Sequence, residues 1–327
     1  MMRALLLIST LLVALWSGYW FVGKSAVETG FSTFLQQAPA RGIDVSLADY
    51  SIAGFPNRFD LTVTTPRLTD QRSGMTWTAP FVQVFSLSYK PWHVIAAFAP
   101  DQTLVTANEV ISVQSTKMQA SVVVSPNSSL TLDRTTVVGD SVKAVSSLGW
   151  TLAADTLRFA TRLDPSRSNA YDIGLEVLGL TPDPGLSARL PDLPPQMSVA
   201  RVDATASLSA PLDRFAAEGR PVLTALSLRE LLLTWGDLSV FAKGDLTVVN
   251  GFPEGRIDIR VTGWRNLVAL ASGVGLVTPE VAPTVLGVME AFAANSGDAT
   301  ILEMPLVFTD GWMMLGPLPL GPAPRLN

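Results

Sequence analysis

Residues 58–64 read Arg-Phe-Asp-Leu-Thr-Val-Thr. In this stretch Phe59, Leu61 and Val63 alternate with polar side chains, and a period of two is typical of a β-strand with one buried face. The same pattern predicts further strands at 85–89, 118–124, 157–163, 171–177, 202–208, 238–242, 246–248 and 257–261. Gly, Pro, Asn and Asp separate these short segments, which favours antiparallel pairing over alternating strands and helices. We therefore expect a mainly β (α+β) fold with one or more large, curved antiparallel sheets.

An uncharged apolar stretch, ALLLISTLLVALWSGYWFV, precedes the strands and runs from Ala4 to Val22. A helix of about 19 residues spans about 28 Å, close to the hydrocarbon thickness of a bilayer. Its distal end is rich in Trp and Tyr, as in the aromatic belt of a membrane interface. We interpret residues 1–24 as an uncleaved membrane anchor, and the alternative is a signal peptide cleaved near Ala26.

The charges that flank this stretch predict its orientation. Arg3 and the α-amino group give a short positive flank, which favours a cytoplasmic N-terminus. Everything after Lys24 is then exported. We expect a single-pass protein of the bacterial inner membrane with a periplasmic body.

Helical spacing concentrates late in the chain. The sequence predicts helices at 264–275 and 278–295, the second with Thr278 as N-cap and Pro279 in its first turn. A shorter helix at 31–37 would continue outward from the anchor.

The segment Thr181–Gln196 is the internal stretch with the most linker-like Pro and Gly content. It predicts a soft boundary between a β-rich half at 25–180 and a second β-rich half at 197–327. The Pro-rich tail, 315–327, should lie on a sheet edge or along the surface.

Composition excludes several classes of chemistry. The 327-residue chain has a formal net charge of −5, no Cys and one His. The acidic balance argues against nucleic-acid binding. The absence of Cys and the presence of only one His argue against thiolate or multi-histidine metal sites. We expect no metal, no cofactor and no catalytic residue.

Individual polar residues fit structural roles. His93 lies at a predicted turn without a nucleophile motif nearby. The charges at Asp133-Arg134 and at Arg201 and Asp203 fit cross-strand pairs. Arg58 would either meet a lipid phosphate or pair with a nearby carboxylate such as Asp60 or Asp44.

The alternating apolar residues are the candidate functional surface. In a closed sandwich they would bury one another, whereas in an open sheet they would line a groove for acyl chains. Both readings apply to the same set: Phe59, Leu61, Val63, Phe85, Leu87, Tyr89, Tyr171, Ile173 and Leu175.

Several blocks resemble one family. They are Gly54–Leu61 (GFPNRFDL), Ala79–Gln83 followed by Ser86–Ile95, Asn169–Gly174 and Leu315–Pro322. On these blocks the chain is identified as a member of an alphaproteobacterial family, domain of unknown function 2125. That resemblance implies a lineage and a compartment, and it brings no catalytic residues.

A looser resemblance links Gly244–Val248 and Gly251–Ile259 to AsmA-type envelope proteins. It implies an inner-membrane helix followed by a long curved sheet whose apolar concave face guides lipids. The leading hypothesis is therefore a non-enzymatic, membrane-anchored periplasmic protein that binds or transfers phospholipid in envelope maintenance. The alternative is a structural or assembly factor that binds another envelope protein, and a third is a hydrolase of unknown type.

Overall fold

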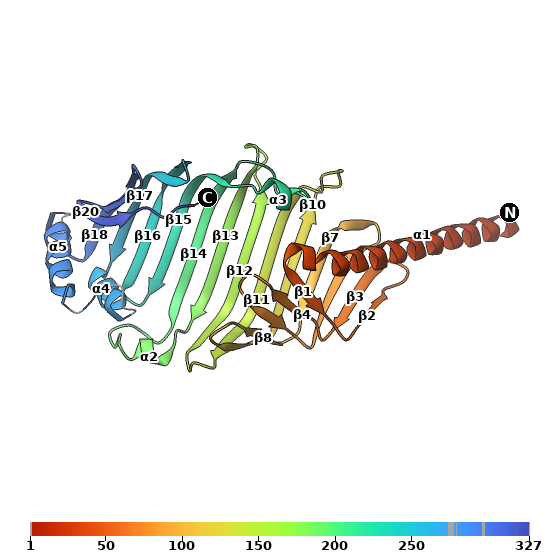
Figure 1. Cartoon of the computed structure of the whole chain (residues 1–327), viewed down its shortest axis with the longest axis horizontal. Helices are drawn as coiled ribbons and strands as arrows, with labels where there is room; N and C mark the ends of the chain where they lie inside the picture. Colours follow the sequence, from red (N-terminus) through yellow and green to blue (C-terminus); the bar gives the residue numbers. More distant parts are fainter. Residues whose placement is uncertain (1, 274–277, 279, 296–297, 327) are drawn as a thin grey trace. The chain divides into compact units, whose positions relative to one another are not determined.

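The computed structural model describes every residue except 1, 274–277, 279, 296–297 and 327. The chain divides into two compact units, residues 1–124 with 144–149 and residues 125–143 with 150–327. The described residues form twenty strands, and all the strand pairings given below are antiparallel. The expected mainly β fold, with a long apolar N-terminal helix and few late helices, is confirmed (Figure 1).

The first unit begins with one long helix, which is followed by a short 3-10 turn and ten strands. The elements are α1 (Met2–Gln37), η1 (Pro39–Arg41), β1 (Ile43–Ser46), β2 (Asp49–Ala53), β3 (Arg58–Thr64), β4 (Arg67–Asp70), β5 (Thr76–Thr78), β6 (Phe81–Leu87), β7 (Lys90–Phe98), β8 (Asp101–Val105), β9 (Val110–Gln114) and β10 (Lys117–Val124). The helix expected at 31–37 is the distal end of α1, so anchor and helix are continuous.

These ten strands form two rows of five. One row has the order β2-β3-β6-β7-β10, and the other has the order β1-β4-β5-β8-β9. Each strand of one row is joined to one strand of the other row by a two-residue break, and three of these breaks contain a proline: Thr65-Pro66, Ala79-Pro80 and Ala99-Pro100. Proline has no N–H to give to the ladder, so it ends one strand and lets the chain begin the next.

The second unit is a meander in which each strand from β12 to β20 pairs with the next. Its strands are β12 (Thr151–Leu163), β13 (Ala170–Leu180), β14 (Met197–Leu208), β15 (Leu223–Trp235), β16 (Leu238–Val249), β17 (Phe252–Thr262), β18 (Ile301–Thr309), β19 (Trp312–Leu315) and β20 (Leu318–Pro322). A further strand, β11 (Leu132–Ser146), has residues in both units. The expected strands at 238–242 and 246–248 are one strand, β16.

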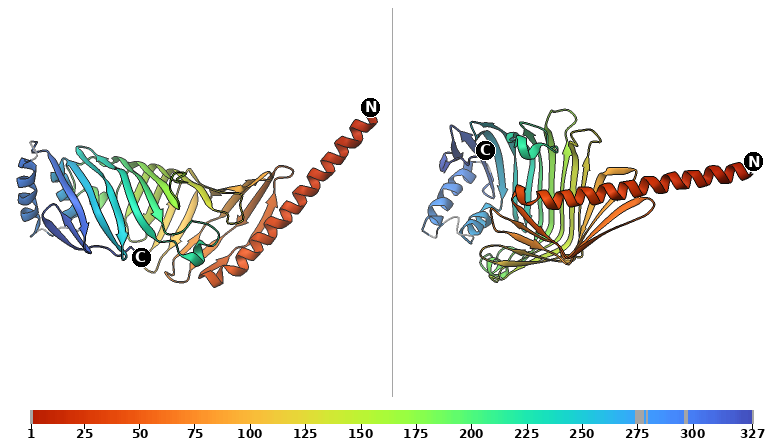
Figure 2. Two further views of the ribbon diagram at one scale, coloured as in Figure 1. Left: turned by 90° about the horizontal axis from the view of Figure 1, so that it is seen from above. Right: turned by 45° about the vertical axis from the view of Figure 1, so that its right-hand side comes forward.

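The described residues of the second unit form four helices: α2 (Pro184–Ser187), α3 (Ala216–Gly219), α4 (Trp264–Gly273) and α5 (Ala282–Asn295). Figure 2 shows α4 and α5 at one end of this sheet. The second late helix begins at Ala282, four residues after the expected start, and Pro279 and residues 274–275 lie outside the described part of the chain. The segment 181–196, expected as a soft boundary, joins β13 to β14 inside the second unit.

Candidate functional site

Three of the candidate apolar residues lie beneath α1. Phe59, Leu61 and Val63 are buried on one face of β3. The Trp20 ring lies 6.1 Å from the Phe59 ring, and Trp20 is itself 5% exposed. Gly23 leaves room for the Phe59 ring, because a Cβ at this position would overlap it. In the first unit these side chains are therefore core, packed against the helix that carries the apolar N-terminal stretch.

The register of β3 and β6 places two other candidates on the opposite face. Directly opposed residues of antiparallel strands project to the same side of the sheet. Phe85 is opposite Asp60, and Leu87 is opposite Arg58, so both face away from α1. Tyr89 lies in the turn after β6 and is exposed, so the strand expected at 85–89 ends at Leu87.

A cavity of about 400 Å³ lies between α1 and the first unit's sheet. Its lining is mostly apolar and comes from both elements: Tyr19, Gly23, Ala26, Val27, Phe59, Leu61, Val84, Ser86, Ser88, Pro91 and Val94. The Oγ of Ser88 is buried and makes no hydrogen bond with the described residues. The packing of α1 on this sheet is thus not complete.

The remaining candidates lie on β13 in the second unit. Tyr171, Ile173 and Leu175 share one face of the strand, and their partners on β14 are Ala206, Ala204 and Val202. Following the register outward, the same face stays apolar from β12 to β18. We call it the apolar face of the second unit.

The middle of this face is not closed. Eleven of its side chains are only partly buried, and we call them the open apolar stretch: Leu157, Phe159, Ile173, Leu175, Val177, Val202, Leu226, Leu228, Leu231, Leu246 and Ile257. Large apolar side chains at the centre of a two-layer domain are normally buried. The open apolar stretch therefore lacks the covering layer that would make it a closed core.

Both ends of the face are covered. At one end α4, α5 and the β13–β14 loop build a core around Trp235, Trp264 and Leu302, all at most 2% exposed. At the other end the Tyr171 hydroxyl donates to the carbonyl of Leu132 at 3.0 Å, and burial raises the pKa of that hydroxyl. These contacts leave the open apolar stretch between two packed ends.

Sequence reasoning missed the Leu residues of β15, because their alternation is interrupted. Leu226 and Leu228 follow a period of two, but Leu231 is three residues further on. A register shift lies between Leu228 and Leu231, so a β-bulge at Arg229-Glu230 returns Leu231 to the apolar face. The sequence thus contains two short alternating patterns, one on each side of the bulge, which are out of step with each other.

The opposite face of the second unit carries cross-strand ion pairs. Asp172 accepts from Arg162 and from Arg229, each at 3.0 Å, and from Thr205. These contacts, the one with Arg162 foremost, hold the pKa of Asp172 below its ordinary value. Arg229 also pairs with Asp203, and that contact raises the pKa of the guanidinium. Arg201 and Asp203 form cross-strand pairs as expected, with Glu176 and Arg229, whereas Asp133 lies 3.9 Å from Arg134, its neighbour on the same strand. This face suits water.

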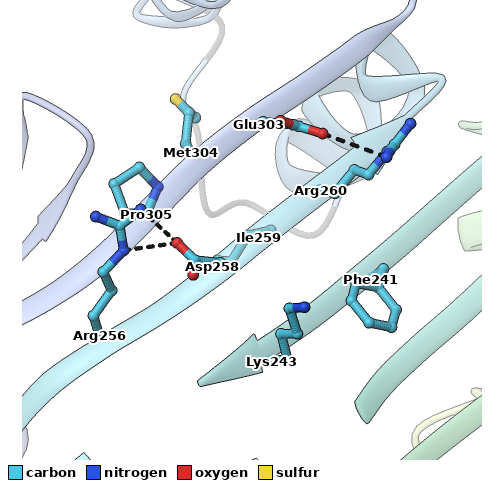
Figure 3. Close-up of a pocket in the computed structure, with 9 residues that line it drawn as sticks. All are labelled: Phe241, Lys243, Arg256, Asp258, Ile259, Arg260, Glu303, Met304 and Pro305. Carbon is cyan, nitrogen blue, oxygen red and sulfur yellow. Dashed lines mark hydrogen bonds and ion pairs between the residues drawn. The ribbon is translucent and has the colours of Figure 1, made fainter. Parts of the chain in front are cut away.

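A hollow of about 720 Å³ lies on this polar face over β16, β17 and β18 (Figure 3). Arg256 pairs with Asp258 at 2.6 Å and Arg260 with Glu303 at 3.4 Å. The side chains that line the hollow thus largely satisfy one another, and Lys243 adds a positive charge at its rim.

The polar candidates sit in ordinary surroundings. His93 lies within β7 and not at the expected turn, and its Nε2 is 3.0 Å from Ser121 Oγ. Arg58 pairs with Asp60 at 2.7 Å. Across the described residues, no group of three or more His, Asp or Glu side chains is placed to hold a metal ion. The Arg58 guanidinium is nevertheless 57% exposed.

Comparison with known proteins gave a family match over most of the chain. The model of the family described as "Uncharacterized protein conserved in bacteria (DUF2125)" matches residues 20–324. No curated protein and no solved structure matches the chain.

Proposed function

Taking as premise that the chain belongs to the bacterial family DUF2125, we propose that it is a membrane-anchored, non-enzymatic protein of the cell envelope that binds lipid acyl chains. The open apolar stretch of the second unit carries this proposal. The protein would act in the manner of AsmA-type proteins, in which an apolar sheet face shields acyl chains from water.

The anchor is supported by α1, the one described helix that is long and apolar enough to span a bilayer. Its N-terminal half projects past the strands of its unit (Figure 1), and its side chains there are mostly exposed. The positive flank at Arg3 favours a cytoplasmic N-terminus. The body after Lys24 would then lie in the periplasm, with the anchor in the inner membrane.

The dimensions of the open apolar stretch suit an acyl chain. It extends from β12 to β17, five strand spacings of about 4.8 Å, or about 24 Å. One leaflet of a bilayer with a hydrocarbon core of about 30 Å holds chains about 15 Å deep. Each methylene buried contributes about 0.8 kcal/mol, so a whole chain gains several kcal/mol without any covalent step.

Photo-crosslinking tests this proposal with a matched pair on one strand. Leu231 lies opposite Val202 on the apolar face, whereas Leu232 lies opposite Arg201 on the polar face. We would place a benzophenone amino acid at each position in turn in the full chain, irradiate it in cells and analyse adducts by mass spectrometry. Phospholipid adducts at 231 and not at 232 are expected. No lipid at either site, or equal yields at both, would reject the proposal.

A second candidate is an assembly factor that binds another envelope protein. The observation in its favour is the last hairpin, where Trp312 and Leu320 are 55% and 52% exposed. Exposed strand edges with apolar side chains recruit partner strands. A reproducible protein cross-link at Trp312, together with no lipid at Leu231, would favour this function.

A further inference from the structure

Two hairpin turns of the first unit meet α1 near the end of its apolar stretch. The Trp16 indole donates to the carbonyl of Pro56 at 3.1 Å, in the β2–β3 turn. The Tyr19 hydroxyl donates to the carbonyl of Ser88 at 2.6 Å, in the β6–β7 turn. Since Val22 ends the apolar stretch, these contacts lie within it rather than beyond it.

Helix geometry fixes the depth of the turns relative to the anchor. Trp16 precedes Val22 by six residues, which at 1.5 Å per residue is about 9 Å along the axis. If the apolar stretch spans the bilayer, the turns that contact Trp16 and Tyr19 reach the same depth as these side chains. That depth is below the hydrocarbon edge at Val22, in the acyl region next to the interface where Trp and Tyr concentrate.

The side chains at the two turns match this environment. Phe55 is 53% exposed and Tyr89 is 54% exposed, although both are large and aromatic. Phe55 packs edge-on against Trp20, with ring centroids 5.3 Å apart. Arg58 and Lys90 are exposed close to the turns, where cations meet lipid phosphates.

Backbone carbonyls near the turns are also hydrogen-bonded, which suits a medium with little water. The carbonyls of Pro56, Ser88 and Arg58 each accept a hydrogen bond from an α1 side chain. An unpaired carbonyl at this depth would cost several kcal/mol, so these contacts lower the cost of insertion.

We propose that the β2–β3 and β6–β7 turns insert Phe55 and Tyr89 into one leaflet of the bilayer beside α1, just below the headgroups. The anchor and two turns then make three points of attachment, and three points fix the tilt of the first unit on the bilayer. A single helix would leave that unit free to swing. The inference rests on the retained anchor of the proposed function, and it is independent of acyl-chain binding by the second unit.

Site-directed spin labelling tests the inference directly, because the chain contains no Cys. The single substitutions Phe55→Cys and Tyr89→Cys report the turns, and Leu11→Cys reports the centre of the anchor. Met75→Cys is the matched control, since Met75 is also an exposed apolar residue, in the β4–β5 turn of the same unit. That turn is bonded to Gly42, past the far end of α1.

The full chain would be reconstituted in vesicles of phosphatidylethanolamine and phosphatidylglycerol, and each label tested with oxygen and with a water-soluble nickel chelate. We expect the labels at 55 and 89 to lie at a depth between those at 11 and 75. Labels at 55 and 89 as exposed to nickel as that at 75, with the label at 11 in the bilayer, would overturn this inference alone. A label at 11 in water would overturn the anchor as well.

Discussion

The packing of α1 on β3 depends on Gly23. A Cβ here would overlap the ring of Phe59, which is buried, whereas a Cβ at Gly30 of the same helix meets open space. Overpacking of this kind costs about 1–3 kcal/mol, and Gly→Ala at an open helical site gains about 0.5–1 kcal/mol. We expect Gly23→Ala to be less stable than Gly30→Ala by about 2 kcal/mol in thermal unfolding of the full chain in micelles. Equal stability would show that α1 does not pack on β3.

Asp172 gives a pH-dependent stability whose sign follows from its partners. Its pKa is lowered in the folded protein, so the unfolded state binds the proton more tightly and stability rises with pH. The contribution is present above the unfolded pKa of about 3.9 and is lost as pH falls through the lower folded value. We expect Asp172→Ala to cost about 1–2 kcal/mol at pH 7.

Urea unfolding at several pH values checks this expectation. The difference between the wild type and Asp172→Ala should shrink below pH of about 4. The control is Asp133→Ala, whose carboxylate is 42% exposed and lies 3.9 Å from Arg134. If the difference in the free energy of unfolding between the wild type and Asp172→Ala stays constant with pH, the charge on Asp172 does not stabilise the fold.

Strands and their alternation could be predicted from the sequence, but register could not. The pattern at 58–64 gave the strand β3, while nothing local indicated that Phe85 is opposite Asp60. A shift of one residue moves every side chain to the other face, and register depends on partners far along the chain. For this reason alternation alone does not separate Phe59 from Phe85, although they lie on opposite faces of the sheet.

The bulge in β15 gives a test of register at the scale of one strand. Deleting Glu230 removes the extra residue, so that either Leu231 and Leu233 or Leu226 and Leu228 must turn to the polar face. Leu233 packs against the core around Trp235, so we expect a loss of about 3–5 kcal/mol. Deleting Glu218, in the short helix α3, is the control and should cost far less. Similar losses in urea unfolding would show that the bulge does not set the register.

At the scale of whole units, the sequence could not distinguish a closed core from an open groove. Both need the same alternation, and they differ only in whether a second layer covers the apolar face. In the first unit α1 supplies that layer over Phe59, whereas in the second unit α4 and α5 cover one end. Only the structure, and not the alternation, therefore shows that the open apolar stretch is partly buried.

The first unit also bears on whether the N-terminal segment is retained. Cleavage near Ala26 would remove Trp20 and Gly23, leaving Phe59 without its cover. Removing the Trp20 side chain alone from a core costs about 3–5 kcal/mol, so the cleaved unit would be much less stable. The family match also begins at residue 20, within α1.

We therefore expect the protein isolated from bacterial membranes to have the mass of the uncleaved chain, allowing for loss of the initiator Met. Intact-mass spectrometry of a membrane extract measures this directly, and a chain that begins near Val27 would contradict it. A variant with a protease site inserted between Val22 and Gly23 serves as the control. Its digestion should raise hydrogen exchange in β3 while leaving β17, in the other unit, protected. Unchanged exchange in β3 would show that the unit folds without Trp20, and that retention of the anchor has another cause.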